Sequence, residues 1–369
     1  MSAPVYKSGS QGAVRELRSR VWATPRHRAL TTLAVVVVLV LGAELFVRWI
    51  EPQLPIVRAG DDAEMIIKAR RITEMGAHDP QVDVVFFGTS MMDSAVDPEA
   101  FLDGSTRFDS VYNAGVVGAP TRTQVRWASE IVLPALDPDV IVLGIHPIDL
   151  LVNDVLNLNI QPQQADVVFA GVLRETKSGP IGAVERFAND HSVLVQQRGN
   201  LRRPELVLEA TRNTITGTEP QKFIPKRTQE YWEPRISPLG ESALFHGDEF
   251  NITGVKDQLR ENLKPESFSV GDVHKLFEAT LAEGAQVVVV IPPIPTAAWG
   301  DVGIDFGALA SGTALIRQIA AQYDVPVIDF SSANYDNALF ADLVHTNERG
   351  AERLSRDLAR QLDALEPAG

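Results

Sequence analysis

The sequence predicts an α/β protein in which a parallel five-stranded sheet lies between two layers of helices. Five short apolar runs predict the strands, at residues 82–87, 110–112, 140–143, 287–291 and 326–329. Each run is apolar at consecutive rather than alternate positions, which is typical of parallel strands buried on both faces. Helical patterns separate the runs, and strands that alternate with helices favour a three-layer αβα sandwich.

The first element of the chain is an apolar segment at residues 29–47. As a helix it is about 28 Å long, which is enough to cross a bilayer. Glu44 makes this span imperfect, but it lies near the distal end, where a carboxylate is least costly. We therefore expect a transmembrane anchor at residues 29–50, with a buried core helix or a cleaved signal sequence as the alternatives.

Basic residues ahead of the span predict its orientation. The residues are Lys7, Arg15, Arg18, Arg20, Arg26 and Arg28, against the single acid Glu16. By the positive-inside rule, residues 1–28 form a cytoplasmic tail and the chain after Arg48 lies outside the cytoplasmic membrane. The long leader, without a convincing small-X-small cleavage site, favours a retained single-pass anchor.

The rest of the chain divides into a connecting segment and one large domain. Residues 51–80 are mixed and polar, with an amphipathic stretch at 65–72, and are predicted to be a stalk or linker. The domain spans 81–366, with helices expected at 121–136, 273–283 and 306–323. A final helix places apolar residues along one face: Ala351, Leu354, Leu358, Leu362 and Leu365.

The third and fourth apolar runs are separated by residues 144–286, which is much longer than the other connections. This length predicts an insertion of helices and loops at about 153–270. We expect it over the carboxyl ends of the strands, where open α/β sheets bind their ligands. Substrate choice would then depend on the insertion.

Composition excludes several classes of function. The formal charge is −14, and the short cluster of Arg198, Arg202 and Arg203 is no dense basic stripe, which argues against nucleic-acid binding. The chain has no cysteine, so disulfides, thiolate catalysis and cysteine-ligated zinc are excluded. None of the seven histidines forms a short two-histidine ligand motif, and we expect neither a metal nor a cofactor.

Ser90 is the candidate nucleophile because it follows the first predicted strand within Gly88-Thr89-Ser90. It would therefore lie at the carboxyl end of that strand. A glycine turn with a serine that caps the next helix gives the same pattern, so the tripeptide alone is weakly specific. Ser94 is the competing serine, although it lies farther from the strand end.

The loops after the second and third strands offer candidate oxyanion donors. Gly115 follows the second strand, and a glycine there lets the backbone offer its N–H beside the N–H of Ser90. His146 is the first polar side chain after the third strand. It could donate to an oxyanion or be a buried histidine with a structural role.

Asp342 and His345 complete a candidate catalytic triad. They are three residues apart, just before the final helix, and can project from one loop towards the strand ends. A serine hydroxyl is a poor nucleophile, so it needs a base to remove its proton and a third group to orient that base. The sequence therefore predicts that His345 deprotonates Ser90 while Asp342 orients His345.

Together these motifs resemble the SGNH (GDSL-like) hydrolases over roughly residues 82–149 and 284–362. The nucleophile block of that family maps to Gly88-Thr89-Ser90, its glycine block to 113–115, and its acid-base block to 342–345. The third block departs from the family pattern, because this chain has Gly144-Ile-His146-Pro147 where Gly-X-Asn-Asp is usual. The resemblance implies a flavodoxin-like αβα fold, with His146 either replacing the usual asparagine or leaving the site impaired.

The anchor and the insertion resemble a subset of bacterial SGNH-like proteins that act on O-acyl groups of cell-envelope polysaccharides. That resemblance implies an esterase or an O-acyltransferase outside the cytoplasmic membrane, acting on an acylated glycan or another ester. A membrane protein that transfers acyl groups is a possible partner. The alternative is a catalytically silent binding or assembly partner of a membrane acylation or polysaccharide-export machine, which the altered third block motivates.

Overall fold

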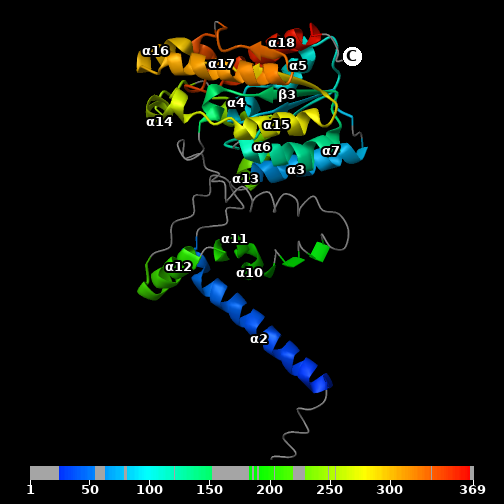
Figure 1. Cartoon of the computed structure of the whole chain (residues 1–369), viewed down its shortest axis with the longest axis vertical. Helices are drawn as coiled ribbons and strands as arrows, with labels where there is room; N and C mark the ends of the chain where they lie inside the picture. The colour runs from blue at the N-terminus through cyan, green and yellow to red at the C-terminus, as the bar shows by residue number, and fades with distance from the viewer. Residues whose placement is uncertain are drawn as a thin grey trace, which may run out of the picture. The chain divides into compact units, whose positions relative to one another are not determined.

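A computed structural model shows a parallel five-stranded sheet with helices on both faces (Figure 1). The strands are β1 (Val84–Phe87), β2 (Val111–Asn113), β3 (Val140–Gly144), β4 (Gln286–Ile291) and β5 (Val327–Asp329). Their order is β2-β1-β3-β4-β5, which is the flavodoxin-like doubly wound order. The predicted fold class is therefore confirmed, and each strand lies within a residue or two of its predicted apolar run.

The structure describes residues 25–54, 63–78, 81–119, 121–151, 183–184, 187–188, 191–202, 204–218, 229–247, 249–253, 255–333 and 335–365. The predicted cytoplasmic tail, apart from residues 25–28, and parts of the predicted insertion, including 153–182 and 219–228, lie outside this part of the chain. The described chain forms two compact units. One comprises Met1–Val57 and Arg186–Lys222, and the other comprises Arg58–Glu185 and Phe223–Gly369.

The larger unit contains the sheet and most of the helices. Its helices are α3 (Ala63–His78), α4 (Ser90–Asp93), α5 (Pro98–Gly104), α6 (Thr121–Trp127), α7 (Leu133–Leu136), α13 (Gln229–Trp232), α14 (Lys256–Asn262), α15 (Gly271–Leu281), α16 (Thr296–Val302), α17 (Phe306–Gln322) and α18 (Glu348–Asp363). A π-helical turn at Ala128–Val132 joins α6 to α7, so the predicted helix 121–136 is continuous. The helices predicted at 273–283, 306–323 and the C-terminus correspond to α15, α17 and α18.

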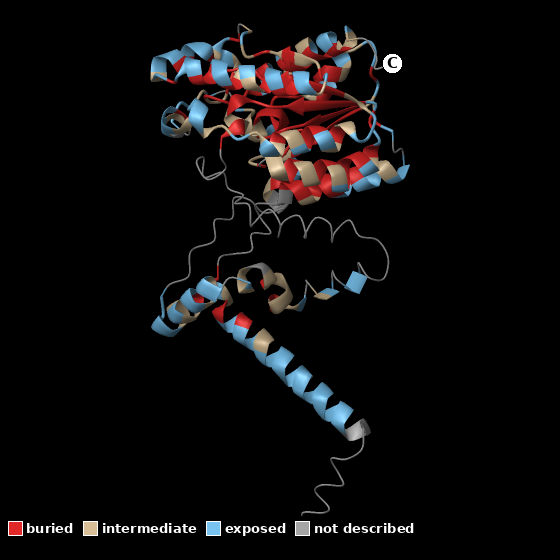
Figure 2. Ribbon diagram, viewed as in Figure 1, coloured by how far each residue is buried: buried red, intermediate tan, exposed pale blue. Residues whose placement is uncertain are grey.

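Alternate residues of each strand enter different cores on the two faces of the sheet. On one face, Val85, Ile141 and Val289 pack with side chains from α3, α6, α7, α15 and α17. On the other face, Val84 and Val142 pack with α5 and α18. Figure 2 shows the result, a largely buried layer of strands between helices whose outer faces are exposed. This burial explains why the strand sequences are apolar at consecutive positions.

Helix α3 differs from the stalk expected for residues 51–80. Its side chains Met65, Ala69 and Ile72 are almost fully buried in the core beneath the sheet. These residues recur at the spacing of one helical face, so the amphipathic pattern at 65–72 belongs to a helix of the αβα body. An amphipathic helix such as α3 buries its apolar face against the apolar face of the sheet.

A turn of the predicted insertion packs against the edge strand β2. The backbone N–H of Asn113 donates to Leu239 O at 2.8 Å. Gly240 has φ +94°, and a Cβ there would lie 2.2 Å from Asn113 O, so only glycine fits this approach. The turn is held from the other side by the guanidinium of Arg71, which donates to Ile236 O at 2.8 Å and to Ser237 O. Part of the insertion is therefore built into the sheet edge beside the strand ends.

The smaller unit contains α2 (Pro25–Ile50), α10 (Val193–Gln196), α11 (Arg198–Leu201) and α12 (Pro204–Thr216). Among the described residues, α2 is the one helix long and apolar enough to cross a membrane by length and composition. Its large apolar side chains, such as Val38 and Leu39, are about two-thirds exposed within the protein. The predicted span at 29–50 falls within this helix.

Candidate active site

Ser90 lies at the carboxyl end of β1, where it begins the short helix α4. The turn is tight: a Cβ on Gly88 would lie 2.5 Å from the side chain of Met92. The buried side chain of Asn113 holds the same turn, because its amide donates to Met92 O, Asp93 O and Val96 O at 2.9–3.2 Å. A side chain at the end of β2 therefore fixes the backbone around Ser90.

The structure brings Ser90, His345 and Asp342 together in one hydrogen-bonded chain. Ser90 Oγ lies 2.8 Å from His345 Nε2, and His345 Nδ1 lies 2.8 Å from Asp342 Oδ2. Both distances are those of ordinary hydrogen bonds. The nucleophile therefore comes from the loop after β1, and the base and its orienting acid come from the loop between β5 and α18.

Asp342 is held in the form that supports an imidazolium. Burial acts to raise the pKa of Asp342, but hydrogen bonds from the His345 ring and from the N–H groups of Val344 and His345 outweigh it and lower the pKa. An ionised carboxylate accepts from His345 Nδ1–H and leaves Nε2 free to take a proton from Ser90. The arrangement can therefore run general-base chemistry on the serine.

The side chain of Phe245, from a short 3₁₀ turn at Ala243–Phe245, covers the ring of His345. The two rings are nearly parallel, at 5°, with their centroids 3.6 Å apart. Nearby, Asn251 N donates to Ala341 O at 2.7 Å, and Asn251 pairs with Asp342 in an isolated bridge. The segment after Phe223 thus contacts the loop that carries the base.

His146, at the carboxyl end of β3, is fully buried and presents an unused donor. Its Nδ1 accepts from Ile148 N at 3.2 Å, so the ring proton lies on Nε2. Within the described chain, Nε2 has no hydrogen-bond partner. Burial lowers the pKa of His146 to about 3, so the ring is neutral at physiological pH. A buried N–H without a hydrogen-bond acceptor is costly, so His146 remains a candidate functional residue.

Asp149 connects this loop to the turn that carries the serine. Its carboxylate accepts from His146 N at 2.8 Å and from Thr89 Oγ at 3.1 Å. Burial raises the pKa of Asp149 to about 6, although both hydrogen bonds act in the opposite direction. Because Thr89 precedes Ser90, the Asp149 carboxylate joins the loop after β1 to the loop after β3. These two loops lie at the point of the sheet where the strand order reverses.

The N–H of Gly115, a predicted oxyanion donor, is engaged in this structure. It donates to Asn113 Oδ1 at 3.0 Å, and Gly115 O accepts from Lys68 Nζ. The N–H of Ser90 is the first of α4 and has no intrahelical acceptor, as at any helix start. Ser94, the competing serine, donates instead to Ser90 O at 2.7 Å. Ser94 is fully buried and stabilises the turn.

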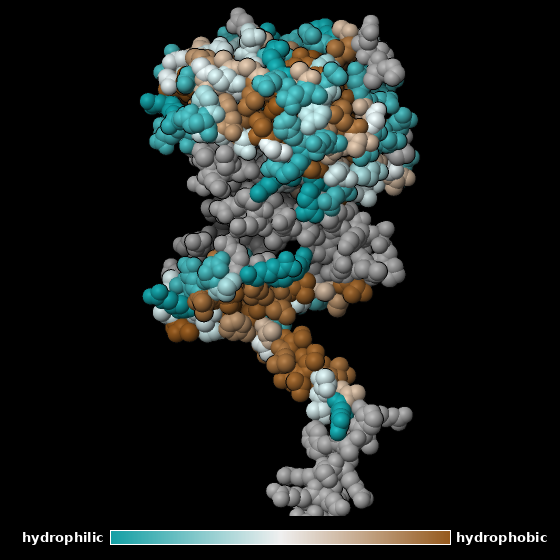
Figure 3. Space-filling view, viewed as in Figure 1, coloured by the Kyte–Doolittle hydropathy of each residue, from teal (hydrophilic) through white to brown (hydrophobic). Residues whose placement is uncertain are grey.

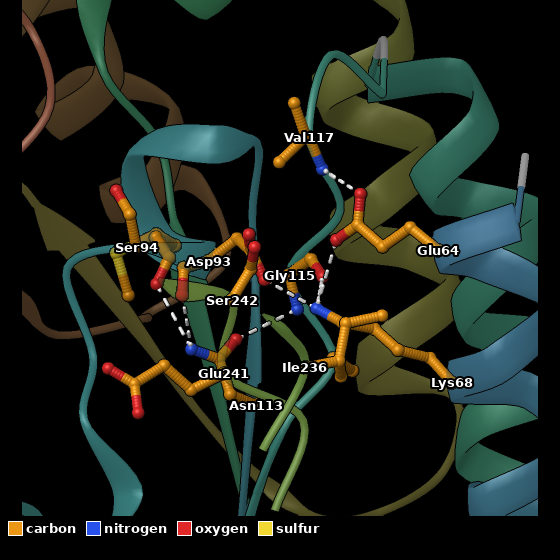
Figure 4. A network of polar contacts seen from close by, with 12 residues as sticks. Glu64, Lys68, Asp93, Ser94, Asn113, Gly115, Val117, Ile236, Glu241 and Ser242 are labelled. Carbon is orange, nitrogen blue, oxygen red and sulfur yellow. Dashed lines mark hydrogen bonds and ion pairs between the residues drawn. The ribbon is translucent and has the colours of Figure 1, made fainter. Parts of the chain in front are cut away.

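A buried charged cluster supports the turn from the side of α3 (Figure 4). Lys68 is fully buried, and its ammonium contacts Asp93 Oδ1, Gly115 O and, at 3.2 Å, Glu64 Oε1. Glu64 also accepts from Val117 N at 3.1 Å. The cluster therefore joins α3 to α4 and to the loop after β2.

In this cluster the Lys68 ammonium faces the carboxyl groups of Glu64 and Asp93, and burial favours the protonated form of both. Burial, followed by the negative charge of Asp93, raises the pKa of Glu64 to about 8, while Lys68 acts in the opposite direction. Burial also raises the pKa of Asp93. A protonated Glu64 beside a Lys68–Asp93 ion pair leaves the buried group close to neutral.

Sequence reasoning did not single out Lys68, Glu64 or Phe245. A signal for Lys68 was present, because it lies on the apolar stripe of Met65, Ala69 and Ile72, where a charge is out of place. Phe245 had no such signal, since its partner is 100 residues away in the chain. Among the described residues, no group of three or more His, Asp or Glu side chains is arranged to hold a metal ion.

Comparison with known proteins assigns no family to the chain. No protein-family model matches the chain, and no curated protein matches it. A solved structure of a candidate acylhydrolase from Bacteroides fragilis NCTC 9343 resembles it over 80% of this chain and 94% of that chain. The identity is 14% and the TM-score is 0.37, a level at which the likeness assigns neither activity nor substrate.

Proposed function

We propose that this protein is a serine-dependent enzyme that hydrolyses or transfers ester-linked acyl groups. The observation that carries the proposal is the unbroken chain from Ser90 Oγ through His345 to Asp342, with both contacts at 2.8 Å. The order of parts matches what serine acyl transfer requires: nucleophile, base and orienting acid. The resemblance to SGNH hydrolases rests on the same residues.

In this mechanism His345 Nε2 takes the proton of Ser90 as Oγ attacks the ester carbonyl carbon. The carbonyl oxygen becomes an oxyanion, and we propose the Ser90 N–H and the His146 Nε2–H as its hydrogen-bond donors. The imidazolium then gives its proton to the leaving alcohol, and an acyl-serine remains. Attack by water releases a carboxylic acid, whereas attack by a sugar hydroxyl makes a new ester.

The proposed substrate is an O-acylated glycan of the cell envelope, and the proposed location is the outer face of the cytoplasmic membrane. Two features support this location: the apolar helix α2 and the basic residues that precede it in the sequence. A membrane acyl-transfer protein is a proposed partner. Assays of the purified protein with acetylated oligosaccharides, with and without an unacetylated acceptor, distinguish an esterase from a transferase.

A catalytically silent binding role is the second candidate. The observation that favours it is the engaged N–H of Gly115, together with His146 in place of the usual oxyanion asparagine. For an enzyme of this class, the Gly115 N–H would have to leave Asn113 before it could bind an oxyanion. A silent domain needs no such rearrangement, because the same loops would then serve only as a recognition surface.

Labelling of the full-length protein in detergent with a fluorophosphonate tests the proposal. We expect one adduct per chain, located on Ser90 by mass spectrometry and absent from Ser90→Ala and His345→Gln. Ser94→Ala tests the competing serine and is expected to keep an adduct on Ser90, at a rate lowered only as far as loss of the hydrogen bond to Ser90 O loosens the turn. Absence of any adduct on the folded parent protein would favour the silent binding role.

A further inference from the structure

Glu44, the one acidic residue of the predicted membrane span, attaches a second segment of the chain to α2. Its carboxylate accepts from Ser192 Oγ at 2.8 Å, from Val193 N at 2.9 Å and from Leu194 N at 3.0 Å. Arg48, one turn further along α2, also donates to it at 2.8 Å. The start of α10 is therefore fixed to α2 about 9 Å before the end of that helix at Ile50.

Apolar packing completes this attachment. Val47, Ile50 and Leu54 are almost fully buried against Val193 of α10 and Ala210 of α12. The side-chain amide of Gln53 donates to Thr218 O just after α12. Helices α10, α11 and α12 therefore form one body with the distal end of α2, although about 140 residues separate them in sequence.

This small body leaves large apolar side chains uncovered. On α12, Leu208 is 71% exposed and Ile215 is 70% exposed, while Val207 and Ala210 face the interior of the unit. Leu208 and Ile215 are seven residues apart and share one face of the helix. Phe187, just before α10, is 63% exposed.

The uncovered surface is continuous with the membrane-spanning helix. Figure 3 shows the apolar colour of α2 continuing onto the adjoining side of the α10–α12 segment, while hydrophilic colour lies on the side away from α2. At the junction, Trp49 is 49% exposed and Phe46 is 40% exposed. Aromatic side chains of this kind gather where a span meets the membrane–water boundary.

We propose that α10, α11 and α12 lie on the bilayer surface at the distal end of α2, with Leu208, Ile215 and Phe187 in the boundary between headgroups and acyl chains. The proposal rests on α2 being a membrane anchor. Lipid is the partner that we propose for this apolar surface, because the surface continues the apolar surface by which α2 would contact lipid. The depth also agrees, since interfacial helices bury their apolar face about 5–10 Å into this boundary and Glu44 fixes α10 about 9 Å before the end of α2.

Arg212 supports the same arrangement. It lies between Leu208 and Ile215 on their face of α12, at spacings of four and three residues, and is exposed. An arginine at an interface can bury its alkyl part beside apolar groups and keep its guanidinium at the lipid phosphates. Such a platform fixes the depth at which the chain leaves the membrane and opposes sliding of α2.

The absence of cysteine in the natural sequence makes a direct test possible. Single cysteines replace Leu208 and Ile215 in the full-length protein, which is labelled with an NBD fluorophore and reconstituted into phosphatidylcholine–phosphatidylglycerol vesicles. Three further positions serve as references: Val38→Cys in the middle of α2, Glu209→Cys on another face of α12, and Glu283→Cys on an exposed site of the sheet domain. Nitroxide lipids with the quencher at different depths then report where each probe lies.

Probes at positions 208 and 215 are expected to show blue-shifted emission and to be quenched most by nitroxides near the headgroups. The probe at position 38 is expected to be quenched most by nitroxides deep in the bilayer. Probes at 209 and 283 are expected to stay accessible to a water-soluble quencher. If the probe at position 38 lies in lipid while those at 208 and 215 are as accessible to water as the probe at 283, α2 is a membrane anchor but α12 does not lie on the bilayer surface. If position 38 itself lies in water, both the anchor and the platform are wrong.

Discussion

Phe245 lies flat against the imidazole of His345, with ring centroids 3.6 Å apart and ring planes at 5°. The contact restricts rotation of the ring that must reach both Ser90 and Asp342. It also removes one face of the imidazole from water. A residue of the insertion is thus a positioning residue for the proposed base, which connects the long insertion to the chemistry of the strand ends.

Replacement of Phe245 by alanine is therefore expected to slow fluorophosphonate labelling of Ser90 by up to about tenfold, since aromatic pairs contribute about 0.5–1.5 kcal/mol beyond burial. Phe245→Tyr keeps the ring and is expected to label at nearly the parent rate. Labelling rates across a pH series are the measurement. A purely structural role for Phe245 predicts instead that Phe245→Ala loses stability with the labelling rate of its folded fraction unchanged.

His146 supplies the second prediction, because its Nε2–H is buried without an acceptor in the described chain. If this group binds the oxyanion, His146→Ala loses about 2.7–4 kcal/mol of transition-state stabilisation, or about 10²–10³ in rate. His146→Asn offers an amide donor and is expected to recover part of that loss. Hydrolysis of a chromogenic acetyl ester measures both variants, and equal rates for His146→Ala and the parent would remove His146 from the mechanism.

The fold and the candidate triad could be predicted from local patterns, because each strand, helix and triad residue has its signal within a short stretch of sequence. Continuous apolar runs such as 140–143 mark buried strands, and Ser90 and His345 follow predicted strand ends. Contacts between distant segments could not be predicted in this way. Neither the stacking of Phe245 on His345 nor the attachment of Ser192–Leu194 to Glu44 leaves a periodic signal.

The third block shows a different limit. By the resemblance to SGNH hydrolases, His146 stands where an asparagine is expected, but the sequence does not show which nitrogen carries the proton. That depends on the hydrogen bond from Ile148 N to Nδ1, a detail of the 3₁₀ turn at Pro147–Leu150. Similarly, Lys68 lies on an apolar stripe of its helix, but nothing in the local sequence shows that Glu64 and Asp93 meet it in the core.

The low pKa of His146 predicts how stability responds to acid. Its pKa is about 3 in the folded protein and about 6.5 when unfolded. Between these values the unfolded chain binds the extra proton, so the free energy of unfolding rises with pH by up to about 1.4 kcal/mol per unit. His146→Gln is expected to flatten this dependence below pH 6.5, as measured by denaturant unfolding in detergent followed by tryptophan fluorescence.

Lys68 is expected to be the most sensitive member of the buried cluster. Lys68→Met leaves Asp93 and Glu64 buried without a cation, and loss of one partner of a buried ion pair costs about 3–5 kcal/mol. The same change at Lys275, which is 65% exposed beside Asp272, is expected to cost less than about 1 kcal/mol. A triple variant, Lys68→Met with Glu64→Gln and Asp93→Asn, should recover part of the loss. Equal effects at Lys68 and Lys275 would contradict the buried arrangement.

Glu64 predicts a stability change of the opposite sign to that of His146. Burial, followed by the charge of Asp93, raises the pKa of Glu64 to about 8 in the folded protein, above its ordinary value of 4.5. Between these values the folded protein binds the extra proton, so the contribution of Glu64 to stability falls as pH rises and is lost through about pH 8. Glu64→Gln stays neutral and keeps an acceptor for Val117 N. We therefore expect its stability relative to the parent to increase steadily from pH 5 to pH 8, as measured by denaturant unfolding. A difference between the two proteins that is constant over this range would show that Glu64 is already ionised beside Lys68 at pH 5.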